Sequence, residues 1–95
     1  MIISQLSVAP IGSGVSVGKY VKTVIAVLKR NNVKFEANAM ATVIETEDLD
    51  TLFNVVKEAH KAVLKSGAKR VITELKIDDR RDKKVTIETK IKSIK

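Results

Sequence analysis

The fold is decided by the stretch Val33-Lys34-Phe35-Glu36-Ala37-Asn38-Ala39-Met40-Ala41-Thr42-Val43-Ile44-Glu45, which holds two β-like runs joined by a short bend. In the first run, Val33, Phe35 and Ala37 alternate with polar residues, a pattern typical of a strand with one apolar face. The second run consists of residues 41–45. The two runs therefore predict a hairpin that turns at residues 38–40, although no Asn-Gly pair marks the turn.

One amphipathic helix is predicted before this hairpin and one after it. Ser16 is a credible N-cap of the first, which ends near Asn31-Asn32 and has its apolar positions at Val17, Val21, Val24 and Leu28. Thr46 or Asp48 can cap the second, and Gly67 is its natural stop. Its apolar stripe consists of Leu49, Leu52, Phe53, Val56, Ala59 and Val63.

Further outward, a strand is predicted at each end of the helix–hairpin–helix unit. Residues 2–9 place Ile2, Leu6 and Val8 on one face, and residues 70–77 alternate in the same way. After residue 77 the chain has one more apolar pattern, at Ile87, Ile91 and Ile94. We favour a short helix capped by Thr86 there, because the alternative, a strand, depends on a weaker alternation.

The order strand, helix, strand, strand, helix, strand predicts an α+β, ferredoxin-like split βαββαβ sandwich spanning residues 1–95 as one domain, with an extra short C-terminal helix. Both long helices then cover one face of an antiparallel sheet. The other, open face is expected to display Gln5, Ser7, Lys34, Glu36, Asn38, Thr42, Ile44, Ile72, Glu74 and Lys76. A domain this small has a modest core, and self-association through this face or its edges would compensate for it.

Composition narrows the class of protein. The chain has no cysteine, so disulfides and thiolate metal sites are excluded and an intracellular protein is expected. No apolar run approaches the roughly 20 residues of a membrane span, and the N-terminus lacks the pattern of a signal peptide. We therefore expect a cytoplasmic protein without a membrane partner.

The formal net charge of +7 is concentrated near the C-terminus. Residues 69–95 carry ten Lys or Arg and five Asp or Glu, which accounts for +5 of the +7. The chain has only three aromatic residues, too few for a base-stacking platform. We therefore favour a solvated rim over a nucleic-acid contact for the lysines of this segment, Lys83, Lys84, Lys90, Lys92 and Lys95.

The densest run of charge is Lys76-Ile77-Asp78-Asp79-Arg80-Arg81-Asp82, at the exit of the last predicted strand. Arginine is a natural bidentate partner of carboxylates, so we favour ion pairs within or between subunits over a ligand site. The residues assigned to an interface on this basis are Lys76, Asp78, Asp79, Arg80 and Arg81.

Several motifs together resemble the YkoF-like thiamine-binding protein family, in its short single-domain branch. They are Pro10-Ile11-Gly12 followed by residues 16–21, Met40 with Thr42, Glu47-Asp48-Leu49-Asp50, Ala59-His60-Lys61-Ala62-Val63, and residues 76–82. The resemblance extends over nearly the whole chain. It implies a ferredoxin-like fold, assembly into dimers or tetramers through sheets, and binding of thiamine or its pyrimidine portion without catalysis.

The candidate ligand contacts are polar residues of the sheet and of the first loop, together with Met40 of the predicted hairpin turn. Ser7, Asn38, Thr42 and Glu74 can hydrogen-bond an aminopyrimidine, and a solvated or subunit-covered sheet explains them equally well. In Gly12-Ser13-Gly14 the backbone can hold an anion, but a tight turn before the helix is favoured. The full set is Ser7, Ser13, Ser16, Asn38, Met40, Thr42 and Glu74.

Metal and catalytic sites find little support in the sequence. His60 is the only histidine, and we interpret it as a half-buried packing residue of the second helix. The aspartates do not follow the spacing of a calcium loop, and no nucleophile stands beside a base. We expect a non-enzymatic binder without a cofactor, whose ligand is thiamine or its hydroxymethylpyrimidine moiety. The alternatives are a basic nucleic-acid-binding module and a purely structural oligomer.

Overall fold

The computed structural model describes residues 1–12 and 18–95, which form a four-stranded sheet and three helices. The elements are β1 (Ile2–Pro10), α1 (Gly18–Arg30), β2 (Lys34–Ala37), β3 (Thr42–Thr46), α2 (Leu49–Lys65), β4 (Val71–Asp79) and α3 (Ile87–Lys92). The predicted α+β, ferredoxin-like sandwich with an added C-terminal helix is confirmed. Ser13, Ser16 and Val17 lie outside the described residues.

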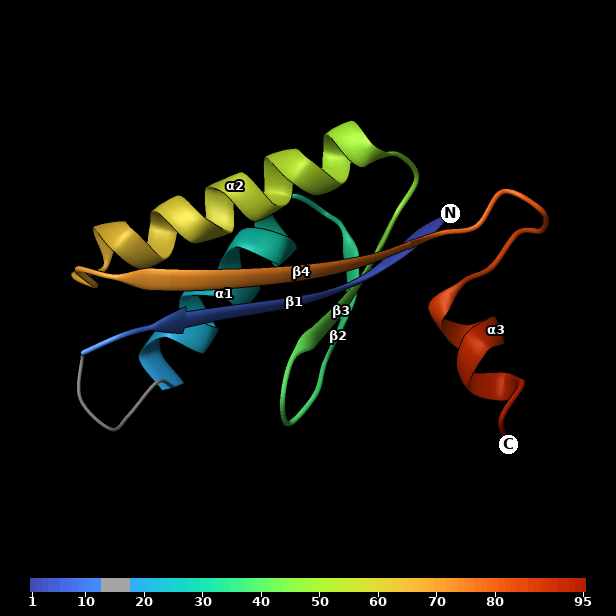
Figure 1. The fold of residues 1–95 in the computed structure, drawn as a ribbon, viewed down its shortest axis with the longest axis horizontal. Helices are drawn as coiled ribbons and strands as arrows, with labels where there is room; N and C mark the ends of the chain where they lie inside the picture. Colours follow the sequence, from blue (N-terminus) through green and yellow to red (C-terminus); the bar gives the residue numbers. More distant parts are fainter. Residues whose placement is uncertain (13–17) are drawn as a thin grey trace.

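The sheet is antiparallel throughout, with strand order β2-β3-β1-β4. β1 pairs with β4 along its whole length, from Ile2 opposite Asp79 to Pro10 opposite Val71. Its pairing with β3 stops at Leu6 opposite Thr42. α1 and α2 cover one face of this sheet, while α3 lies beyond the ends of β1 and β4, on the side of the N-terminus (Figure 1). β2 and β4 are therefore the two edges.

The core lies between the sheet and the two long helices. Leu28, Ile44 and Leu52 are fully buried there, and each such side chain contributes about 1.5–3 kcal/mol through burial. Half-buried His60 joins α2 to the sheet, with its Nδ1 2.7 Å from Thr73 Oγ1. The interpretation of His60 as a packing residue is confirmed.

The predicted helix ends are found at specific side chains. Asp48 caps α2, because its Oδ1 accepts a hydrogen bond of 2.7 Å from the N–H of Thr51. Gly67 follows the helix with a φ of 110°, a left-handed conformation that glycine adopts without strain. Thr86 caps α3 in a reciprocal pair with Thr89, so the short helix is confirmed over the alternative strand.

The predicted apolar stripes of both long helices were partly wrong. Val21 and Phe53 are 46% and 49% exposed, whereas Tyr20, Val27 and Val55 are buried. Each helix packs against the other as well as against the sheet, so its buried arc is rotated from the one that spacing alone selects. The error affects single positions but leaves the element and its cap unchanged.

The predicted facing of β3 was also wrong. Ile44 and Thr42 lie on the helix side, because they stand opposite Ser4 and Leu6 of β1, and paired residues point to the same face. Ile44 is fully buried in the core and Thr42 is 8% exposed. Val43 and Glu45 face the other way. Apolar and polar residues alternate too weakly in this strand to fix its phase, and a shift of one residue reverses every side chain.

Candidate functional site

The open face of the sheet is covered at one end by α3 and the residues before it. Val85 and Ile87 are each 6% exposed, and Ile3, which lies on this face, is 8% exposed. The carboxylate of Glu45, also 8% exposed, accepts a hydrogen bond of 2.8 Å from the N–H of Ile87. This buried contact fixes the start of α3 on the sheet.

Two ion pairs at exposed positions also attach α3 to the sheet. Lys90 Nζ lies 2.8 Å from Asp78 Oδ2 at the end of β4, and Lys34 of β2 pairs with Glu88. The hydrogen bond with Lys34 lowers the pKa of Glu88, and the same bond raises the pKa of Lys34. α3 is thus attached to β2, β3 and β4.

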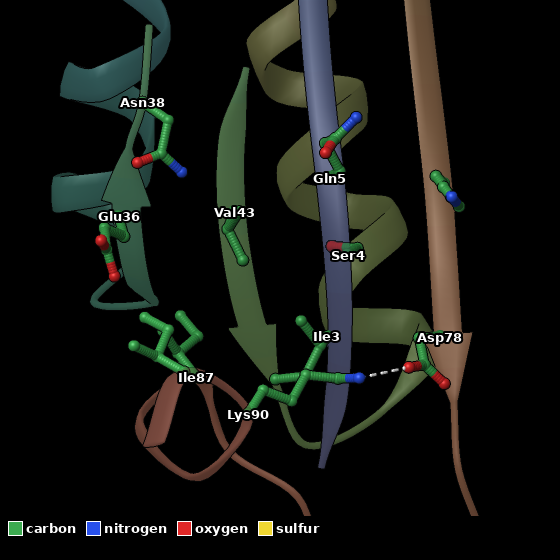
Figure 2. Close-up of a pocket in the computed structure, with 11 residues that line it drawn as sticks. Ile3, Ser4, Gln5, Glu36, Asn38, Val43, Asp78, Ile87 and Lys90 are labelled. Atoms are coloured by element: carbon green, nitrogen blue, oxygen red, sulfur yellow. Dashed lines mark ion pairs between the residues drawn. The ribbon is translucent and has the colours of Figure 1, made fainter. Parts of the chain in front are cut away.

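Between α3 and the strands lies a cavity of about 460 Å³, here called the open-face cavity. Figure 2 shows Glu36 and Asn38 on the β2 side, Gln5 on β1, and Ile87 and Lys90 on α3 below them. A cavity of this size is in the range of small-molecule sites. Its lining residues are Ile3, Ser4, Gln5, Glu36, Asn38, Val43, Lys76, Asp78, Ile87, Lys90 and Ile91.

The lining combines apolar walls with a few polar groups. Ile3, Val43 and Ile87 provide apolar surface, while Gln5 and Asn38 provide amides that both donate and accept hydrogen bonds. Among the described residues, Glu36 has no cationic side chain within 4.0 Å, whereas Asp78 is paired with Lys90. Glu36 is therefore the carboxylate available to a cationic or amino-bearing ligand.

A second, smaller cavity of about 200 Å³ lies between α1, the hairpin turn and the part of β1 beyond its pairing with β3. We call it the hairpin cavity. It is lined by four of the predicted ligand contacts, Ser7, Asn38, Met40 and Thr42, of which Asn38 lines the open-face cavity as well. The remainder is mainly apolar and comes from Leu6, Val8, Ala9, Val21, Val24, Ala39 and Ala41.

The other predicted ligand contacts are not brought to either cavity. Glu74 is exposed on the open face, opposite Ser7 in the β1–β4 register, and lines neither. Ser13 and Ser16 belong to residues that the structure does not describe. The ligand roles of these residues stay predictions.

The charged run at the end of β4 forms ion pairs within the chain. Arg80 donates two hydrogen bonds to Asp82, of 2.6 and 2.9 Å, and Arg81 donates two of 3.0 Å to Asp79. These bonds lower the pKa of both aspartates. Of the residues predicted at an interface, Lys76 and Asp78 line the open-face cavity. The interface roles of all five residues stay predictions.

Sequence reasoning placed Gln5 and Glu36 on the open face but did not assign them to a site. It missed Ile3, Val43 and the contribution of α3. One signal was present: Ile2 and Ile3 are adjacent and both apolar, which indicates a strand end buried on both faces. The return of α3 over the sheet had no comparable signal.

Within residues 1–12 and 18–95 there is no group of three or more acidic or histidine side chains placed to hold a metal ion. No helix in this part of the chain is long and apolar enough to cross a membrane.

The model of a family described as thiamine-binding protein matches residues 4–95. The chain belongs to this family. It is 48% identical over 93 residues to the UPF0045 protein MJ1052 of Methanocaldococcus jannaschii, covering 98% of this chain and 91% of the relative. The UPF0045 protein YqgV of Bacillus subtilis is 40% identical over 99 residues, with 99% and 94% covered. The resemblance found in the sequence is thereby confirmed.

Solved structures agree with the fold. The crystal structure of MJ1052 has a TM-score of 0.90 and covers 98% of this chain and 94% of its own. A proposed thiamine biosynthesis or salvage protein of Thermotoga maritima, TM0486, has a TM-score of 0.83 at 22% identity, with 99% and 98% covered. At that identity the second similarity supports the fold alone.

Proposed function

We propose that this protein binds thiamine, or the aminopyrimidine part of it, in the open-face cavity, and that it does so without catalysing a reaction. The family supplies the class of ligand. The observation that carries the proposal is the pairing of apolar walls with the carboxylate of Glu36, which lies outside every ion pair of the described residues.

The cavity chemistry suits the two rings of thiamine. An aminopyrimidine presents an exocyclic amine and ring nitrogens, with which a carboxylate and side-chain amides can form hydrogen bonds. The thiazolium ring carries a positive charge, which favours a site with an available carboxylate. Ile3, Val43 and Ile87 supply apolar contact for the flat ring faces.

Isothermal titration calorimetry with thiamine tests the proposal. Glu36→Gln is expected to weaken binding roughly 2- to 5-fold, because a solvent-exposed charge–charge contact becomes a neutral one. Glu47→Gln is the matched control, because Glu47 is an exposed glutamate that lines neither the open-face cavity nor the hairpin cavity. If parent protein shows neither heat nor a thermal shift at millimolar thiamine, the proposal is wrong.

The hairpin cavity is the second location for the same ligand, since it gathers four residues selected from the sequence alone. Met40→Ala distinguishes the two locations, because Met40 lines only the hairpin cavity and is 90% exposed. Binding that depends on Met40 and not on Glu36 would move the proposed site to the hairpin.

We further propose that the protein forms a homodimer by antiparallel pairing of β4 with β4 of a second copy. β4 is a nine-residue edge strand, and β1 is its only partner among the strands of residues 1–12 and 18–95. An edge of this length is a ready template for another strand. Beside it, Phe53 and Leu64 of α2 are 49% and 42% exposed, on the side from which His60 reaches Thr73 of β4.

The charges of β4 are self-complementary. If a two-fold axis passes beside Leu75, then Glu74 lies opposite the partner's Lys76, and Lys76 opposite the partner's Glu74. On the helix side the same register brings the exposed flanks of the two α2 helices together. Both features favour a second copy as the occupant of this edge.

A charge exchange tests the register. Glu74→Lys and Lys76→Glu each replace two attractive cross-strand pairs by two repulsive ones, so each variant alone is expected to dissociate roughly 10- to 100-fold more readily. An equimolar mixture of the two variants restores opposite charges at both positions and should give a heterodimer in native mass spectrometry.

Two results would contradict the dimer. One is a parent protein that stays monomeric at sub-millimolar concentration in light scattering. The other is a mixture of the two variants that stays as monomeric as either alone. The double variant Arg80→Ala with Arg81→Ala tests, in the same assay, the interface role predicted for the arginines. If this variant dimerises as the parent does, the arginines have no such role.

A further inference from the structure

A basic cleft of about 200 Å³ lies between α3 and the segment that leads into it from β4. It is distinct from the open-face cavity, with which it shares only Lys90. Its lining is formed by Arg80, Lys83, Lys84, Val85, Thr89, Lys90 and Ser93. Four of these seven residues are cationic and none is acidic.

Two of the four cations are compensated within the chain. Arg80 is bound by Asp82, and Lys90 lies 2.8 Å from Asp78. Lys83 and Lys84 have no carboxylate within 4.0 Å among the described residues. The cleft therefore carries an excess of two positive charges on adjacent residues, which favours the binding of an anion.

The hydroxyl groups of the cleft are already used as donors. Thr89 Oγ1 donates to the carbonyl of Thr86, and Ser93 Oγ donates to the carbonyl of Lys90. The groups of the cleft that remain available to a ligand are therefore the lysine ammonium groups. These bind a ligand of high negative charge more strongly than a neutral polar one. A phosphate monoester, with a charge of about −1.5 to −2 near pH 7, fits this requirement better than a single carboxylate.

Lys90 connects the cleft to the open-face cavity, because it lines both. Figure 2 shows its side chain extended from α3 to Asp78 along the edge of the open-face cavity. We propose that the basic cleft binds the phosphate of a phosphorylated form of the ligand, while the rings of that ligand occupy the open-face cavity. This inference rests on the proposed function and specifies the ligand class.

The first test compares thiamine with thiamine monophosphate by titration calorimetry. Parent protein should bind the phosphate ester roughly 3- to 10-fold more tightly, as expected of two solvent-exposed charge contacts. Lys83→Gln with Lys84→Gln should abolish this preference and leave the affinity for thiamine unchanged. Lys61→Gln with Lys65→Gln is the matched control, since it removes two exposed lysines of α2 that line neither the cleft nor the open-face cavity. Equal affinities in the parent, or a preference that survives in the Lys83 and Lys84 variant, would overturn the inference.

A second probe separates this inference from the proposed function. Inorganic pyrophosphate at low salt should shift the amide resonances of residues 83–93 in the parent and not in the Lys83→Gln and Lys84→Gln variant. If pyrophosphate causes these shifts while thiamine fails to bind, the cleft is an anion site and the proposal of thiamine as the ligand is wrong. If millimolar pyrophosphate causes no shift, the cleft is not an anion site. Salt-sensitive binding of an oligonucleotide that depends on these lysines, without a preference for the phosphate ester, would replace the inference by the nucleic-acid alternative.

Discussion

Replacing Glu45 by alanine is expected to weaken the attachment of α3 to the sheet while the rest of the domain stays folded. Glu45 is 8% exposed and accepts the 2.8 Å hydrogen bond from the N–H of Ile87. A hydrogen bond to a charged group contributes about 1.5–3 kcal/mol, so its loss should raise the population of detached α3 roughly 10- to 100-fold. The burial of Val85 and Ile87 remains and opposes complete release.

Native-state hydrogen exchange measures this effect locally. The amides of Lys90 and Ser93, which bond to Thr86 and Thr89 within α3, should exchange about 10- to 100-fold faster in the variant. Amides at the centre of β1 should keep their protection. Glu47→Ala is the control, because Glu47 is a neighbouring exposed glutamate whose side chain makes no hydrogen bond within the described residues. Exchange of α3 at the parent rate in the Glu45 variant would refute the assignment of Glu45 as its anchor.

Three further outcomes are expected in urea unfolding. Ile44→Ala should cost about 2–5 kcal/mol because Ile44 is fully buried, whereas Ile72→Ala, at a site 43% exposed, should cost much less; the reverse order would contradict the facing of β3. Asp48→Ala should lower the urea midpoint without changing the m-value, since it removes the cap of α2, and an unchanged midpoint would exclude that role. Hydrogen bonds from Asn31 and Arg30 lower the pKa of Glu58, so the ionised carboxylate stabilises the folded protein above its ordinary pKa of 4.5, and this stabilisation is lost as the pH falls through the lowered pKa. Between pH 6 and 3, the free energy of unfolding of Glu58→Gln should therefore fall less than that of the parent. Equal decreases in the two proteins would contradict these hydrogen bonds.

The sequence was sufficient for the order of elements because each has a local signal. The Thr86 cap and the stop at Gly67 depend on neighbours within a few residues, and both are found as predicted. For α2 the local pattern left Thr46 and Asp48 as candidate caps, and the cap is Asp48. The facing of β3 depends instead on its register with β1, which no residue of β3 encodes by itself. Local patterns therefore predicted the elements, and pairing between distant strands decided which side chains reach the site.

The candidate site was predictable only in part for the same reason. Gln5 and Glu36 belong to alternating strands, so their place on the open face followed from periodicity. The cavity itself exists because Ile87 and Lys90 return from the end of the chain to cover residues of β1 and β3. That return depends on a contact between Glu45 and Ile87, separated by 42 residues, which composition and spacing do not reveal.

The central place of β1 in the sheet has a consequence for how the chain folds during synthesis. β1 is made first, yet its longest pairing is with β4, which is the last strand to be made. Contacts between such distant segments slow folding, because the loop between them must close before the pairing is gained. Until β4 leaves the ribosome, β1 therefore lacks its main partner, and the nascent chain depends on keeping this apolar strand from pairing elsewhere.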